Sequence, residues 1–153
     1  MLAKDIMTKD VITVSPAMDL KEVAEIFIRH NISGAPVVDS QKRLVGVITE
    51  GDLVKQQRPL QKPLYLMFLD SAFPINQREI KEEIKVITAG KVEELMSSEP
   101  ITLPEYADVS ELAQVMLSKK INRLPIVNEE DELLGIVTRQ DIIRATYLGE
   151  DND

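Results

Sequence analysis

Two short stretches decide the fold, ISGAPVVD at residues 32–39 and GVITEGD at residues 46–52, because both have counterparts later in the chain. The counterparts are INRLPIVN at 121–128 and GIVTRQD at 135–141, each displaced by 89 residues. The alignment extends without a gap on both sides, which indicates two copies of one structural unit. The identical pairs are Met7/Met96, Ile12/Ile101, Thr13/Thr102, Asp19/Asp108, Glu22/Glu111, Ala24/Ala113, Ile32/Ile121, Pro36/Pro125, Val38/Val127, Leu44/Leu133, Gly46/Gly135, Thr49/Thr138 and Asp52/Asp141.

Each copy predicts the order strand, helix, strand, strand, helix. A β-branched run at 11–14 or 101–103 ends before a proline, which is typical of a strand. Asp19 with Glu22, and Asp108 with Glu111, then match a capping box at the start of an amphipathic helix.

The second half of each copy predicts a hairpin followed by a helix. Apolar runs at 35–38 and 44–48 are separated by five polar residues, and the second copy repeats the pattern. A second helix is expected to open at Thr49 and at Thr138. Met7 and Met96 are expected in the core. The predicted fold is therefore α/β (α+β), with two β-α-β-β-α units related by a pseudo-twofold axis and clefts between them.

Composition narrows the class of protein. The chain has 153 residues, no cysteine, one histidine and a net charge of −8. The absence of cysteine excludes disulfides and Cys-ligated metal sites, and the single histidine argues against a multi-His metal site. The negative net charge argues against broad nucleic-acid binding. The longest apolar run, 64–69, is too short to span a membrane, and the N-terminus lacks a signal-peptide pattern. We expect a cytoplasmic protein with no nucleic-acid or membrane partner.

The domain boundaries are predicted at 1–57 for the first repeat, 58–90 for a linker, 91–148 for the second repeat and 149–153 for a disordered acidic tail. The linker has three prolines and, at 77–87, a helical pattern of isoleucines. Its apolar run 64–69 fits core packing, a lid or a homodimer contact.

The Gly-x-x-Thr-x-x-Asp motifs at 46–52 and 135–141 allow two interpretations. In one, Thr and Asp form a capping box at a strand-to-helix junction. In the other, the helix start binds an anion, and the Asp accepts hydrogen bonds from ribose hydroxyls. The glycine inside the strand would let a flat ring or another backbone approach closely.

The ordered set of these motifs, repeated, resembles the CBS domain (named for cystathionine β-synthase), and the chain is similar to a tandem CBS pair. The resemblance rests on Thr13 and Thr102, on the segments around Pro36 and Pro125, and on the two Thr-x-x-Asp motifs. It implies a binding module without catalytic residues or a resident metal. CBS pairs bind adenosine-containing ligands such as AMP, ADP, ATP or S-adenosylmethionine between the repeats, with Mg possible beside ATP.

The resemblance also implies two sites, each combining the strand-1 threonine and pre-proline loop of one repeat with the Thr-x-x-Asp of the other. The first would comprise Thr13, Ile32, Ser33, Gly34, Ala35, Pro36, Thr138, Arg139 and Asp141. The second would comprise Thr102, Ile121, Asn122, Arg123, Pro125, Thr49 and Asp52.

Residue chemistry suggests a role for each group in these sites. The aspartates would hold ribose, the threonines would meet phosphate or ribose oxygens, and the pre-proline loops would read adenine. Arg139 or Arg123 would clamp phosphate. Acidic Glu50 favours the first site over the second. His30 fits a helix end better than a ligand contact, and Lys119 and Lys120 fit a solvated helix end.

Three functions remain open from sequence: an adenosine-ligand sensor, an enzyme acting on nucleotides, and a protein-interaction or dimerisation module with vestigial clefts. The absence of a phosphate-binding Walker loop and of a recognisable nucleophile–base pair disfavours the enzyme. We expect a regulatory module that forms a homodimer and acts on an effector protein that the sequence does not identify.

Overall fold

The computed structural model describes residues 1–55 and 90–149. The predicted helix at 77–87, the apolar run 64–69 and residues 150–153 of the predicted tail lie outside the described residues. The elements are α1 (Ala3–Ile6), α2 (Leu20–His30), β1 (Gly34–Val38), β2 (Leu44–Thr49), α3 (Glu50–Lys55), α6 (Val92–Leu95), β3 (Leu103–Pro104), α7 (Val109–Lys119), β4 (Arg123–Val127), β5 (Leu133–Thr138), α8 (Arg139–Ile143) and the π-helix η1 (Arg144–Leu148).

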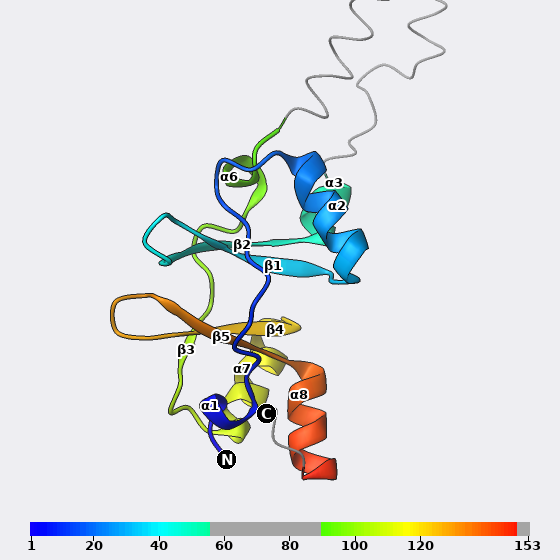
Figure 1. The fold of residues 1–153 in the computed structure, drawn as a ribbon. Coiled ribbons are helices and arrows are strands. Elements are labelled where there is room, and N and C mark those ends of the chain that lie inside the picture. The colour runs from blue at the N-terminus through cyan, green and yellow to red at the C-terminus, as the bar shows by residue number, and fades with distance from the viewer. Residues whose placement is uncertain (56–89, 150–153) are drawn as a thin grey trace, which may run out of the picture.

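The two repeats form two similar units that meet through their hairpins (Figure 1). β1 pairs with β2 and β4 pairs with β5, both antiparallel and both with a register shift near the tip. The tips also contact each other, because Leu44 N donates to Asp131 O and Leu133 N donates to Lys42 O. The helices and hairpins predicted within the two repeats are confirmed, and the pairing of the tips places the two sheets on either side of a pseudo-twofold axis.

Each unit is completed by the N-terminal segment of the other repeat. Thr8 exchanges backbone hydrogen bonds with Ile136 of the second repeat, and Ser97 does the same with Val47 of the first. As a result, α1 lies beside α7 and α8, whereas α6 lies with the first repeat (Figure 1). The exchange ties the repeats together, since neither core is built from one continuous stretch.

The two hydrophobic cores confirm this exchange. One contains residues of α1 with residues of the second repeat; the other contains Val92 of α6 with residues of the first repeat. Met7 is buried and Met96 packs against the first-repeat core, as predicted. The core members are Ala3, Ile6, Met7, Leu112, Met116, Leu124, Ile126, Val137 and Ala145 in one cluster, and Val14, Leu20, Val23, Phe27, Ala35, Val37, Ile48 and Val92 in the other.

The first strand of each unit is shorter than predicted. In the first repeat it is a single parallel bridge between Val14 and Val37, and in the second it is the two-residue strand β3. The physical reason is the crossing of the chain: Thr8 is held by the second repeat and Val14 by the first, so the residues between them span the two units.

The predicted capping box at Asp19 is wrong, although its counterpart at Asp108 accepts a hydrogen bond from Glu111 N at 2.8 Å. The Asp19 carboxylate instead binds the Lys91 ammonium of the exchanged segment. The repeat equivalent of Lys91 is Leu2, which carries no charge, so Asp108 remains available to its own helix.

The strand glycines admit the exchanged segments. An ideal Cβ on Gly46 would lie 2.7 Å from the backbone oxygen of Ser97, and one on Gly135 would lie 2.9 Å from that of Thr8. The sequence predicted that these glycines admit either a flat ring or another backbone. The structure shows another backbone at both positions.

Candidate functional site: two clefts between the repeats

The first cleft is a cavity of about 550 Å³ bounded by both repeats. Its walls come from the pre-proline loop before β1, the corner between β5 and α8, and the chain that crosses between the units. This volume lies within the range of small-molecule sites. The lining residues are Thr8, Asp10, Val11, Ile12, Asn31, Ile32, Ser33, Gly34, Pro36, Asn122, Arg123, Ile136, Thr138, Arg139 and Gln140.

The second cleft, of about 480 Å³, is the pseudo-symmetric counterpart. It lies between the pre-proline loop before β4 and the corner between β2 and α3. Its lining residues are Ser33, Val47, Thr49, Glu50, Gly51, Ser97, Glu99, Pro100, Ile101, Lys120, Ile121, Asn122, Arg123 and Pro125. The two clefts therefore pair each pre-proline loop with the strand-to-helix corner of the other repeat, the same combination that the CBS resemblance implies.

Most of the predicted site residues line these clefts. In the first they are Ile32, Ser33, Gly34, Pro36, Thr138 and Arg139; in the second they are Ile121, Asn122, Arg123, Pro125 and Thr49. Five predicted residues, Thr13, Ala35, Asp141, Thr102 and Asp52, are not among the lining residues. Ala35 is fully buried in the first-repeat core. Their roles in ligand binding stay predictions.

The structure adds residues that sequence reasoning missed. Ile12 and Ile101, one position before the predicted threonines, line the clefts, together with Asp10 and Glu99. These residues belong to the crossing segments, whose position depends on the exchange between repeats. The repeat alignment could have pointed to these residues, because Asp10 and Glu99 are aligned carboxylates at the 89-residue offset.

Both Thr-x-x-Asp motifs form capping boxes. Thr138 N donates to Asp141 Oδ2 at 2.7 Å, and Asp141 N donates to Thr138 Oγ1 at 3.4 Å. The same bonds at Thr49 and Asp52 measure 2.8 and 3.3 Å. Asp141 is only 6% exposed, and its Oδ1 lies 3.5 Å from Arg144 Nη1. These aspartates therefore shape the corners on which the threonines and the neighbouring charged residues are displayed.

Arg123 lies between the two clefts and lines both. Its Nη2 donates to Ser33 Oγ across the pseudo-twofold axis, and its guanidinium occupies the space beside Gly34. Burial lowers the pKa of Arg123, while the negative charge of Glu50 opposes that shift. The side chain stays cationic, because an arginine is not deprotonated in proteins.

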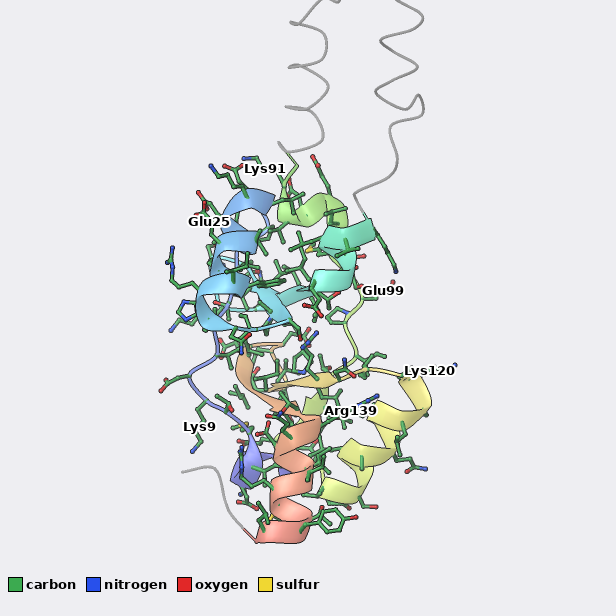
Figure 2. The ribbon with its side chains drawn as sticks, turned by 90° about the vertical axis from the view of Figure 1, so that its right-hand side faces the viewer. Lys9, Glu25, Lys91, Glu99, Lys120 and Arg139 are labelled. Atoms are coloured by element: carbon green, nitrogen blue, oxygen red, sulfur yellow. The ribbon has the colours of Figure 1, made fainter. Side chains whose placement is uncertain are left out.

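Arg139 and Glu50 occupy equivalent corners and have opposite charges. Both are exposed, Arg139 in the first cleft and Glu50 in the second. Figure 2 shows Arg139 at the start of α8, where the second repeat faces the first. Arg139 and Arg123 supply two cations to the first cleft against one carboxylate, Asp10, so this cleft suits an anionic group.

The structure distinguishes among three other candidates, Lys119, Lys120 and His30. Lys120, in a left-handed conformation at the end of α7, lines the second cleft, whereas Lys119 and His30 line neither cleft. Lys120 can therefore offset Glu50 or Glu99 there. Figure 2 labels Lys120 and Glu99 on the side of the molecule that also carries Arg139.

Two classes of feature are not found in residues 1–55 and 90–149. These residues contain no group of three or more His, Cys, Asp or Glu side chains placed to hold a metal ion. No helix within the same ranges is long and apolar enough to cross a membrane.

Known proteins share both the sequence and the arrangement of repeats. Protein MJ1426 of Methanocaldococcus jannaschii is 36% identical over 95% of this chain and 90% of its own length. The crystal structure of MJ1225 from the same organism has a TM-score of 0.75 at 28% identity. The alignment covers 94% of this chain and 46% of that protein. The CBS domain pair of protein MJ0100, solved with 5′-methylthioadenosine and S-adenosyl-L-methionine, has a TM-score of 0.69 at 29% identity, covering 98% of both chains.

The family model of the CBS domain matches the chain twice, at residues 3–58 and 92–147. These ranges contain both pre-proline loops, both Thr-x-x-Asp corners and the two short helices that the repeats exchange. The chain therefore belongs to the CBS domain family and carries two CBS domains in tandem.

Proposed function

We propose that this CBS pair is a regulatory module that binds an adenosine-containing ligand between its repeats, with a phosphate-bearing ligand in the first cleft. The observation that carries the proposal is the first cleft itself. Its cavity of about 550 Å³ is lined by the aliphatic side chains of Val11, Ile12 and Ile32 and by Arg123 and Arg139. Aliphatic side chains suit the faces of a purine, and guanidinium groups suit a phosphate.

The similarity to MJ0100 supports the adenosine moiety, since that CBS pair was solved with two adenosine-containing ligands. The candidate ligands are AMP, ADP, ATP and S-adenosylmethionine, with Mg²⁺ accompanying ATP. The regulatory effect would arise if the ligand binds one arrangement of the repeats more tightly than another. The effector would be a protein that binds one of these arrangements selectively. This chain itself would need no catalytic step.

The proposal is tested by isothermal titration of the protein with the four ligands, in the presence and absence of Mg²⁺. Arg139→Met removes the exposed cation and keeps an apolar stem, so we expect affinity for AMP to fall by about tenfold. Affinity for 5′-methylthioadenosine, which has no phosphate, should change less than threefold, about 0.7 kcal/mol.

The matched control is Arg29→Met, which removes an exposed cation of α2 that lines neither cleft. Its AMP affinity should equal that of the wild type. Failure of all these ligands to bind the folded wild-type protein would reject the proposal.

A second role, self-association into a homodimer, is favoured by one observation. The exposed apolar residues Ile28 and Leu117 are repeat equivalents, and so are Val54 and Ile143. Their exposures range from 56 to 83%, on helices that pack as α2 with α3 and α7 with α8. Apolar residues repeated on both units fit a symmetric contact between two copies.

This proposal predicts that Leu117→Asp shifts the protein from dimer to monomer in multi-angle light scattering. Ser118→Asp adds the same charge one residue along the exposed part of α7 and should leave the dimer intact. A monomeric wild type would contradict the proposal, and so would an intact Leu117→Asp dimer.

A further inference from the structure

The two clefts are related by pseudo-symmetry, but the symmetry fails at Arg123. The repeat equivalent of Arg123 is Gly34. The guanidinium occupies the space into which a Cβ on Gly34 would project, so that a side chain at position 34 would collide with it. One arginine therefore fills the region where the two pre-proline loops meet, and a side chain at position 34 would require that arginine to move.

Arg123 is accessible from both sides of that region. It lines the first cleft and the second, and its hydrogen bond to Ser33 Oγ holds it at the boundary between them. Ser33 and Asn122, themselves repeat equivalents, also line both cavities. The wall between the clefts is thus made of these three side chains, and only Arg123 among them is charged.

The other charged groups of the clefts divide unequally. Without Arg123, the first cleft keeps Arg139 and Asp10, which balance. The second cleft would keep Lys120 against Glu50 and Glu99, an excess of one negative charge. The second cleft is therefore the one that depends on Arg123 to accept an anion.

We propose that Arg123 is shared by the two clefts, so that a phosphate bound in the first cleft weakens the binding of a second phosphate in the other. This inference rests on the proposed function and names a rule of occupancy within it. A phosphate that engages Arg123 and Arg139 draws the guanidinium toward the first cleft and neutralises it. Glu50 and Glu99 then repel an anion in the second cleft, whereas an uncharged adenosine ligand meets no such penalty.

Linkage makes the effect reciprocal: a phosphate held by Arg123 in the second cleft weakens phosphate binding in the first by the same factor. The coupling requires no movement of the repeats, since both ligands compete for one charge. It also sorts ligands by chemistry, favouring a phosphorylated nucleoside in the first cleft beside an uncharged or cationic one in the second.

The test compares AMP with adenosine, which differ only in the phosphate, by isothermal titration of the full chain at low ionic strength. We expect adenosine to fill two sites with affinities within about threefold of each other after correction for statistics. AMP should bind in two steps, the second weaker by about tenfold or more, a factor typical of coupling between sites.

Two equal AMP steps would overturn the coupling while leaving the proposed function intact. A single site for both ligands would also overturn it, because coupling needs two working clefts. No binding of either ligand to the folded protein would reject the proposed function, and the coupling with it.

Two substitutions locate the effect. Arg123→Met keeps much of the apolar stem and removes the shared charge. The first AMP step should weaken by about fivefold or more and the second by less than about twofold, so the ratio of the two steps should fall. Glu50→Gln should strengthen the second AMP step by about fivefold and leave the first step unchanged. An unchanged ratio of AMP steps in a folded Arg123→Met protein would overturn the proposal. Should that variant not fold, the Glu50→Gln ratio decides in its place.

Discussion

At the scale of single residues, the 89-residue offset shows where one repeat departs from the other. Asp19 binds Lys91, whereas its counterpart Asp108 caps its own helix. The difference follows from the residue supplied by the exchanged segment, which is a lysine in one unit and Leu2 in the other. A local motif such as a capping box predicts a bond correctly only when no distant group competes for the same carboxylate.

The hairpin turns offer a second residue-scale comparison. The Asp39 carboxylate accepts hydrogen bonds from Gln41 N and Arg43 N at 2.8 and 3.0 Å, and from Arg43 Nε. Its equivalent, Asn128, accepts the matching bonds from two backbone amides of its own turn, Glu130 N and Glu132 N. The bonds from Arg43 and Gln41 hold the pKa of Asp39 below its usual value, against a smaller opposing effect of burial.

We predict that Asp39→Asn leaves the protein nearly as stable as the wild type at neutral pH, because an amide satisfies this turn in the other repeat. A carboxyl with a depressed folded-state pKa contributes stability above its unfolded pKa and loses it as pH falls through the folded value. The wild type should therefore lose its advantage over the variant below about pH 4. Urea unfolding at pH 7 and pH 3 measures this, and a gap that widens with acid would contradict it.

At the scale of elements, the predicted helices and hairpins form because their signals are local. Apolar spacing, the polar five-residue turns and the Thr-x-x-Asp corners each lie within a few residues of the structure that they specify. The predicted length of the first strand in each unit was too great, because its β-branched residues cross between the units and line the clefts. In these segments the strand propensity of the β-branched residues is overridden, because the chain has to cross from one unit to the other.

The strand glycines are an element-scale requirement that can be tested. A Cβ at Gly135 would lie 2.6 Å from Met7 Sδ and 2.9 Å from Thr8 O. The methionine can move, but the backbone oxygen is held by the bridge between Thr8 and Ile136. We predict that Gly135→Ala lowers the free energy of unfolding by about 1–3 kcal/mol, the usual effect of overpacking.

The matched control for this prediction is Gly51→Ala. Gly51 lies in α3, and a Cβ there would meet only Thr49 Oγ1, at an ordinary 3.5 Å. Alanine in a helix is favoured over glycine, so this variant should be more stable by about 0.5–1 kcal/mol. Chemical denaturation of both variants is decisive, and equal effects of the two would contradict the role assigned to Gly135.

At the scale of the whole molecule, the exchange of α1 and α6 makes the two CBS repeats mutually dependent. Ile6 is 1% exposed within the core of the second repeat, although in sequence it belongs to the first repeat. Its equivalent, Leu95, packs against the core of the first repeat. The clefts lie between units that are held together by these segments, which is how a ligand there could bias the arrangement of the pair.

We predict that Ile6→Ala costs about 2–5 kcal/mol and loosens the second repeat first. Hydrogen exchange should lose protection in α7, β4 and β5 before it does so in β1 and β2. Leu95→Ala, which removes the equivalent side chain, should reverse that order. Loss of protection in β1 and β2 first in Ile6→Ala would contradict the exchange.

The amino-acid sequence alone was enough to predict the repeat and its helices and hairpins, and the resemblance to the CBS domain implied which loop faces which corner across the clefts. Those features rest on periodicity and on hydrogen bonds between near neighbours, and a second copy of each pattern confirms the first. Two contacts became visible only in the folded chain: Lys91 binds the Asp19 carboxylate, and Arg123 donates to Ser33 between the clefts, over separations of 72 and 90 residues. Such contacts depend on how the units are docked, because a charge selects its partner by distance in space rather than by distance along the chain.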